Sequence, residues 1–135
     1  MAVQLNHTIV HSHDQDTEAR FVAEVLGLPE PSRFGHFTVV SVANEVSLDF
    51  MTSSEVTTQH YAFLIGEDEF DAVAARLRER GAATFADPGH RAPGHNTNDG
   101  GRGMYFDSPS GHNLEVLTRP YGSGSGEAER RKPTT

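Results

Sequence analysis

The fold is decided by one stretch of sequence, residues 101–115, which runs GRGMYFDSPSGHNLE. Its centre, 108–111, is rich in turn-forming residues, because Pro restricts φ and Gly adopts conformations that other residues avoid. β-forming residues lie on both sides, so we expect a hairpin with strands at 103–107 and 112–119. Glu115 lies in an apolar part of the second strand, where an unpaired carboxylate would be costly to bury. The hairpin therefore predicts a carboxylate with a dedicated partner.

This hairpin is the end of a weak internal repeat. Each half begins with a strand led by a histidine, His7 and His60, and continues with a helix that ends at a glycine. Each half finishes with a carboxylate between apolar residues, Asp49 and Glu115. Recurrence of both order and chemistry is more informative than any single motif. In chain order we expect strands at 5–10, 37–43, 46–51, 59–65, 83–86, 103–107 and 112–119, with helices at about 14–26 and 68–80, each capped by Asp and ended by Gly27 or Gly81.

Strand alternation gives the two carboxylates a common direction. Glu115 and Asp49 both project away from the more apolar side of their strands. If that face is concave, they can converge with His7 and His60 on a divalent metal. Two neutral imidazoles and one carboxylate leave coordination positions open, which indicates chemistry or ligand capture rather than a closed structural site.

The composition excludes several other classes of function. The 135 residues carry a formal charge of −8 without a basic cluster before the last few positions, so neither nucleic acid nor an anionic membrane is an expected partner. The absence of cysteine excludes disulfides and thiolate zinc sites. No apolar stretch approaches the roughly 20 residues that span a bilayer, and no signal peptide is recognisable, so we expect a cytoplasmic protein.

The doubled pattern and the run at 101–115 resemble the vicinal oxygen chelate superfamily, which includes glyoxalase I, ring-cleaving dioxygenases, fosfomycin-modifying transferases and bleomycin-binding proteins. The resemblance implies one α+β domain, 1–121, of two tandem βαβββ modules, about 3–58 and 59–121, forming a curved mixed or antiparallel sheet around a metal-binding cleft. Residues 122–135, rich in Gly and Ser, are expected to form a flexible tail.

The resemblance also assigns roles to the four residues of the repeat. His7, His60 and Glu115 match the metal positions of the family, and Asp49 falls where glyoxalase I-like members carry a second carboxylate, normally Glu. The metal could be Zn, Mn, Ni, Co or Fe(II), since all accept nitrogen and oxygen ligands. Many small relatives pair, so we expect a homodimer by analogy.

The leading functional hypothesis is a glyoxalase-like lyase or isomerase. Its small substrate would chelate the metal through adjacent oxygens, while Glu115 or Asp49 moves a proton. One alternative is an Fe(II)-dependent ring-cleaving dioxygenase, because two histidines and one carboxylate also suit oxygen chemistry. The other is a protein that sequesters an antibiotic such as bleomycin. The resemblance implies that bleomycin-binding members lack the metal ligands and bind the drug in an aromatic cleft. The retained His7, His60 and Glu115 and the absence of Trp therefore argue against sequestration.

Each candidate also has a simpler interpretation. His7 and His60 could be hydrogen-bonded core histidines, Asp49 a hydrogen-bonded inward carboxylate, and Glu115 an ion-pair partner of Arg102 or Arg119. The long loop 87–102 places His90 and His95 as candidates for substrate contact, since such loops are often functional. The remaining residues that we considered, each with a structural or surface role as the simpler interpretation, are His11, His13, His36, His112, Asn96, Asn98, Asp99, Phe50, Phe63 and Tyr105.

Overall fold

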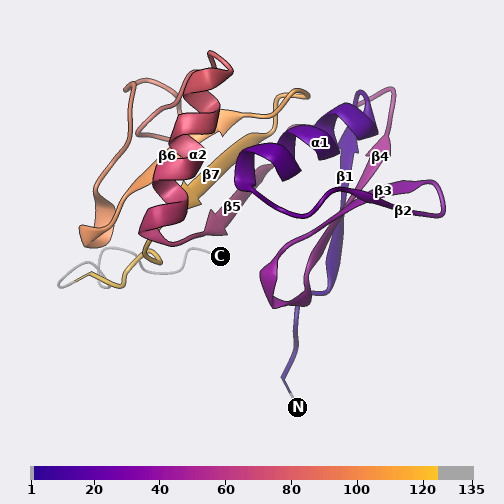
Figure 1. The fold of residues 1–135 in the computed structure, drawn as a ribbon, viewed down its shortest axis with the longest axis horizontal. Helices are drawn as coiled ribbons and strands as arrows, with labels where there is room; N and C mark the ends of the chain where they lie inside the picture. Colours follow the sequence, from indigo (N-terminus) through magenta and orange to yellow (C-terminus); the bar gives the residue numbers. More distant parts are fainter. Residues whose placement is uncertain (1, 125–135) are drawn as a thin grey trace. The chain divides into compact units, whose positions relative to one another are not determined.

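The computed structural model describes residues 2–124 and has the α+β architecture that the sequence predicts, with two helices and two mixed sheets (Figure 1). Contacts between residues divide these into two units. The first contains residues up to Thr58 together with Ser108–Gly111, and the second contains Gln59–Asp107 and the described residues from His112 onward. The predicted tail, 122–135, lies outside the described residues from position 125.

The first unit is a four-stranded sheet with one helix. Its strands pair in the order β1-β4-β3-β2, with β1 parallel to β4 and the other pairs antiparallel. The elements are β1 (His7–Ser12), α1 (Gln15–Leu26), β2 (Ser32–Phe34), β3 (Phe37–Ser41), the 3-10 turn η1 (Ala43–Glu45) and β4 (Ser47–Thr52). Helix α1 contacts β1, β3 and β4, and its apolar residues are buried together with those of the sheet. Helix α1 therefore covers one face of this sheet and not the opposite one.

Both ends of α1 follow from local sequence. Asp14 is the N-cap, and its carboxylate accepts hydrogen bonds from the N–H groups of Asp16 and Thr17. Gly27 follows the helix with φ 69° and ψ 33°, a left-handed conformation that only glycine adopts without strain. The predicted limits of this helix are confirmed.

Two features of the first unit differ from the expectation or extend it. The sequence did not predict β2, because its three residues are all exposed and show no alternation. The strands expected at 37–43 and 46–51 pair as a hairpin, and its turn is formed by Asn44 and Glu45, which both have positive φ, 58° and 62°. Two consecutive left-handed residues match the twist of a tight hairpin.

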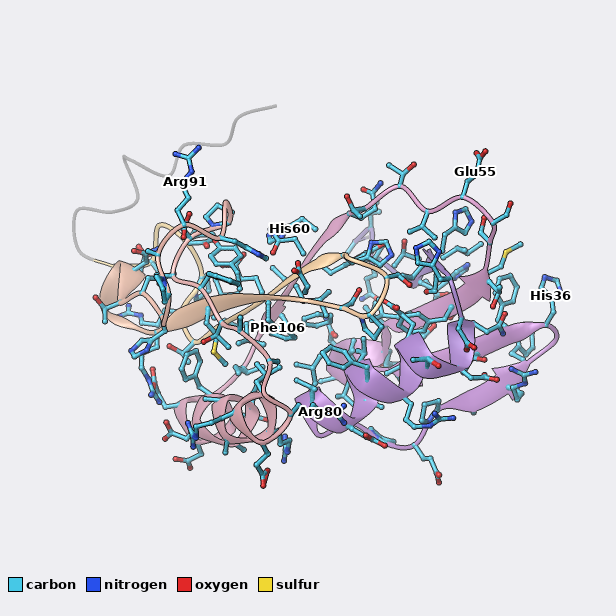
Figure 2. All side chains as sticks on the ribbon, turned by 90° about the horizontal axis from the view of Figure 1, so that it is seen from above. His36, Glu55, His60, Arg80, Arg91 and Phe106 are labelled. Carbon is cyan, nitrogen blue, oxygen red and sulfur yellow. The ribbon has the colours of Figure 1, made fainter. Side chains whose placement is uncertain are left out.

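The second unit is a three-stranded sheet with one helix. Its strands pair in the order β5-β7-β6, with β5 parallel to β7 and β6 antiparallel to β7. The elements are β5 (His60–Leu64), α2 (Glu67–Glu79), the 3-10 turn η2 (Asn98–Gly100), β6 (Gly103–Asp107) and β7 (Asn113–Leu117). Figure 2 shows His60 on the side of this sheet away from α2, whereas Phe106 lies on the side of the helix.

Two predictions for the second unit need correction. The weak strand expected at 83–86 is reduced to isolated bridges from Phe85 to Pro93 and Tyr105. Asp68 is not the cap of α2: Gly66 occupies that position, and the Glu69 carboxylate accepts from its N–H at 2.8 Å. The three acidic residues of the first helical turn complement the helix dipole without a side-chain cap.

Strand register places the histidine and the carboxylate at equivalent positions in the two units. His7 pairs with Ser47 and Ile9 with Asp49 in the first unit, while His60 pairs with Asn113 and Ala62 with Glu115 in the second. Paired residues of neighbouring strands point to the same face. His7 and Asp49 in one unit are therefore equivalent to His60 and Glu115 in the other. No helix among the described residues is long and apolar enough to cross a membrane.

Candidate metal site

Glu115 and His60 form the centre of the candidate site in the second unit. The Glu115 carboxylate Oε1 lies 3.0 Å from His60 Nε2. The Glu115 side chain is 1% exposed, whereas that of His60 is 47% exposed. A buried carboxylate thus faces an imidazole that can be reached from solvent.

The backbone fixes which nitrogen of His60 carries hydrogen. His60 Nδ1 lies 3.0 Å from the carbonyl oxygen of Asn113, which can only accept, so Nδ1 must donate. In the neutral ring Nε2 then presents a lone pair to Glu115. Two acceptors cannot face one another at 3.0 Å unless a proton or a cation lies between them. A backbone carbonyl that orients the ring in this way is typical of histidine metal ligands, and the pair fits a divalent metal.

The second oxygen of Glu115 is held by two tyrosines. Tyr121 donates its hydroxyl to Glu115 Oε2, and the hydroxyl oxygens of Tyr105 and Tyr121 are 2.7 Å apart. Burial, followed by the hydrogen bond to Glu115, raises the pKa of the Tyr121 phenol, so it stays a donor. The Tyr105 ring also stacks on His60, with 5.8 Å between centroids. Tyrosines therefore contact both candidate ligands of this unit.

The loop that follows α2 contacts the same strand. His90 Nε2 lies 2.9 Å from Asn113 Oδ1, and Asn113 Nδ2 donates to the carbonyl of Pro88. The His90 ring stacks on Phe85 at 4.3 Å, and His90 has a positive φ of 57°. Such strain in a non-glycine residue persists only where the surrounding contacts enforce it. His90 is thus anchored to Asn113, the strand partner of His60.

The first unit carries the equivalent pair on its helix-free face. His7 is exposed, and its Nδ1 lies 2.8 Å from the side-chain oxygen of Asn6. Asp49 is half-buried, and its Oδ1 accepts from the hydroxyl of Ser47 at 2.9 Å. The hydrogen-bonded alternative for Asp49 is therefore present in the structure.

The structure brings together two of the three predicted ligands. His60 and Glu115 are adjacent in the second unit, and His7 belongs to the first. Among residues 2–124, neither unit by itself groups three His, Asp or Glu side chains to hold a metal ion. The ligand set of His7, His60 and Glu115 remains a prediction in which both units take part.

Other candidates have different partners. Arg102, a possible partner of Glu115, pairs instead with Glu67 at 2.7 Å and Asp71 at 2.9 Å. Arg119 donates to the carbonyl of Ser123. His95 packs edge-on against Phe70 of α2 and lines a cavity of about 420 Å³ on the helix side.

Sequence reasoning missed Tyr121. It placed this residue at the boundary of the expected tail, because the glycine- and serine-rich run begins directly after it. The available signal was an isolated aromatic residue just beyond a strand that carries a buried acid. Its contact with Glu115, however, depends on how the chain turns after Pro120, which no pattern in the sequence specifies.

Comparison with known proteins gives a consistent family match. The family model described as the Glyoxalase/Bleomycin resistance protein/Dioxygenase superfamily matches residues 4–116. The solved structure of "Oxidase ChaP-H1" is 63% identical, covers 90% of this chain and 99% of its own, and superposes with a TM-score of 0.88. "Oxidase ChaP-H2" is 58% identical, with 92% and 99% coverage and a TM-score of 0.89. The "Glutathione transferase FosA" of Serratia marcescens is 26% identical over 123 residues, which are 86% of this chain and 81% of the transferase.

Proposed function

Because the chain belongs to the Glyoxalase/Bleomycin resistance protein/Dioxygenase superfamily, we propose that it is an enzyme of that superfamily, specifically a metal-dependent oxidase of a small oxygenated molecule. One observation supports the oxidase assignment above all: two solved relatives named as oxidases are 63% and 58% identical over at least 90% of the chain. The glutathione transferase of Serratia marcescens is far more distant, at 26% identity. Oxygen chemistry therefore replaces the glyoxalase-like reaction as the leading hypothesis.

The proposed ligands suit this chemistry. Two histidines and one carboxylate, here His7, His60 and Glu115, form the donor set that non-haem Fe(II) enzymes use for dioxygen reactions. When bound, the iron would supply electrons to dioxygen and polarise the substrate oxygens. The pairing of His60 Nε2 with the Glu115 carboxylate, with Nδ1 held by a backbone carbonyl, is the feature of this chain that fits such a cation.

The protein residues have separate tasks in this proposal. The Asn113 carbonyl keeps His60 in the tautomer that exposes Nε2, and Tyr121 keeps Glu115 in a fixed orientation. Asp49, equivalent to Glu115 by register and only half-buried, is the proposed acceptor of a proton from a substrate hydroxyl. His90 is the proposed contact for a polar group of the substrate, because its loop is anchored beside His60.

The proposal is tested by metal loading and oxygen consumption. Protein freed of metal is reconstituted anaerobically with Fe(II), and oxygen uptake is recorded with a panel of catechols, hydroquinones and polycyclic phenols. We expect uptake that requires Fe(II) and falls to background in Glu115→Gln and His60→Ala, since both variants lose a ligand. The matched control is His36→Ala, which removes an exposed histidine of the first unit that contacts only Phe37 among the described rings.

Other outcomes would contradict the oxidase assignment. Turnover of a substrate by Zn- or Ni-loaded protein without oxygen would support the glyoxalase-like reaction. Protein that binds no metal but retains an antibiotic in equilibrium dialysis would support sequestration. The expected homodimer is a separate proposal, and sedimentation equilibrium of the purified chain tests it.

A further inference from the structure

We propose that Tyr121 is a positioning residue that occupies one oxygen of Glu115 and thereby restricts this carboxylate to a single-oxygen contact with the metal. The inference rests on the proposed function, in which Glu115 is a ligand. It assigns a task to a residue beyond the last strand, directly before the run that the sequence pattern treats as a tail.

The hydrogen bonds of the Tyr121 hydroxyl have a defined direction. A carboxylate oxygen of Glu115 accepts, so the single hydroxyl hydrogen of Tyr121 is used there. The Tyr121 oxygen must then accept from Tyr105, which lies 2.7 Å away. The result is a chain from Tyr105 through Tyr121 to Glu115 in which each hydrogen bond polarises the next.

The two oxygens of the Glu115 carboxylate thus have different partners. Oε1 lies 3.0 Å from Nε2 of His60, and Oε2 accepts from the Tyr121 hydroxyl. The Glu115 and Tyr105 side chains are both buried, so water does not compete freely for Oε2. A metal bound beside His60 meets Oε1. The hydrogen bond from Tyr121 occupies one lone pair of Oε2 and withdraws electron density from it, so a second bond from the metal to Oε2 is disfavoured.

Asp99 fixes the segment that carries Tyr121. Its Oδ1 accepts from the N–H groups of Gly122 at 3.1 Å and Gly124 at 3.2 Å. Asp99 is 5% exposed and has a positive φ of 59°, which marks a position held by its surroundings. A Cβ on Gly124 would lie 2.7 Å from the Asp99 backbone, so only glycine permits this close approach. The position of Tyr121 is therefore enforced by the long loop before β6.

Single-oxygen contact has a chemical consequence for an oxidase. Three donor atoms from three protein ligands leave about half of an octahedral coordination sphere open for substrate and co-substrate. A second carboxylate oxygen would remove one of these positions. The tyrosine pair therefore preserves open coordination as well as holding the ligand.

The test compares Tyr121→Phe with Tyr61→Phe, using Co(II) as a spectroscopic probe in the full chain. Tyr61 is the matched control, since it is a half-buried tyrosine of β5 that packs against His112. We expect Tyr121→Phe to bind Co(II) about 10- to 100-fold more weakly, as found for outer-sphere partners of metal ligands. We also expect its visible absorption bands to change, because these report coordination number. Tyr61→Phe should match the unmodified chain in both measurements.

The outcomes separate the two proposals. If the unmodified chain binds Co(II) and Tyr121→Phe keeps both its affinity and its spectrum, the role of Tyr121 is overturned while the metal enzyme stands. If the unmodified chain binds neither Co(II) nor Fe(II), both proposals fail. Asp99→Ala is the second variant: it leaves every tyrosine and proposed ligand in place and should reproduce the spectral change by releasing the segment. Thermal melts followed by circular dichroism confirm that each variant is folded.

Discussion

Single residues determine what the candidate site can bind. Glu115 is a buried carboxylate with one oxygen facing an imidazole nitrogen and the other accepting from a phenol. A buried charge is tolerated only when it is compensated, and breaking such an arrangement costs more than removing an exposed ion pair. In the proposed metal site, the preference of this position for a cation would therefore arise from the geometry of its neighbours rather than from the net charge of the protein.

Asp99 provides a stability test at the residue scale. Asp99→Ala removes the acceptor for two backbone N–H groups and places alanine at φ 59°, so we expect a loss of about 2–3 kcal/mol in the free energy of unfolding. Asp99→Asn keeps an oxygen acceptor and tolerates the left-handed conformation, so its loss should be less than half as large. Urea denaturation measures both. Equal losses in the two variants would show that the stabilisation does not depend on the side-chain oxygen that accepts from Gly122 and Gly124.

At the scale of elements, the ends of α1 show how local chemistry sets a boundary. Gly27→Ala forces a Cβ into the left-handed conformation at φ 69°, and we expect it to cost about 1 kcal/mol. Gly27→Asn should cost clearly less, because asparagine adopts this conformation more readily. Thermal denaturation of the two variants makes the comparison. The same loss in both would mean that space, not backbone conformation, requires glycine.

The other end of α1 predicts an acid dependence. Hydrogen bonds from the backbone, chiefly from Thr17, lower the pKa of Asp14 below its ordinary value. A carboxyl whose pKa is lower in the folded state stabilises folding above its unfolded pKa of about 3.9, and this stabilisation disappears as pH falls through the folded value. Asp14→Asn retains a capping oxygen but cannot titrate. We therefore expect its melting temperature to fall less steeply than that of the unmodified chain between pH 5 and pH 3.

The sequence predicted the elements whose signals are local. Asp14 and Gly27 delimit α1, and the turn at 108–111 separates β6 from β7, as expected. The short β2 was missed because an exposed three-residue strand has no hydrophobic pattern, and Asp68 was misassigned because several acids compete for the start of α2. Periodicity could place His60 and Glu115 on one face. It could not supply Tyr121, whose position depends on a long-range contact with Asp99.

At the scale of the whole molecule, the proposed metal site draws on both units, and this predicts a thermal shift. A ligand that binds only the folded protein stabilises it by about 2.7 kcal/mol at a concentration 100 times its Kd. We expect Co(II) or Mn(II) to raise the melting temperature of the full chain, and His7→Ala to remove most of this rise although His7 lies in the first unit. Calorimetry with and without metal measures the effect, and His36→Ala is again the control. A full shift in His7→Ala would remove His7 from the ligand set.

The turn Ser108–Gly111 has a consequence for any attempt to produce the first unit alone. It belongs to the first unit, although the strands on either side of it belong to the second. Ser110 donates its N–H to Glu18, which is 1% exposed, and its hydroxyl accepts from the N–H of His13. A gene divided after codon 58 would encode a half with a buried acid deprived of this donor. The first unit therefore depends on residues that the chain supplies much later in its sequence, and residues 1–58 expressed alone would lack this buried contact.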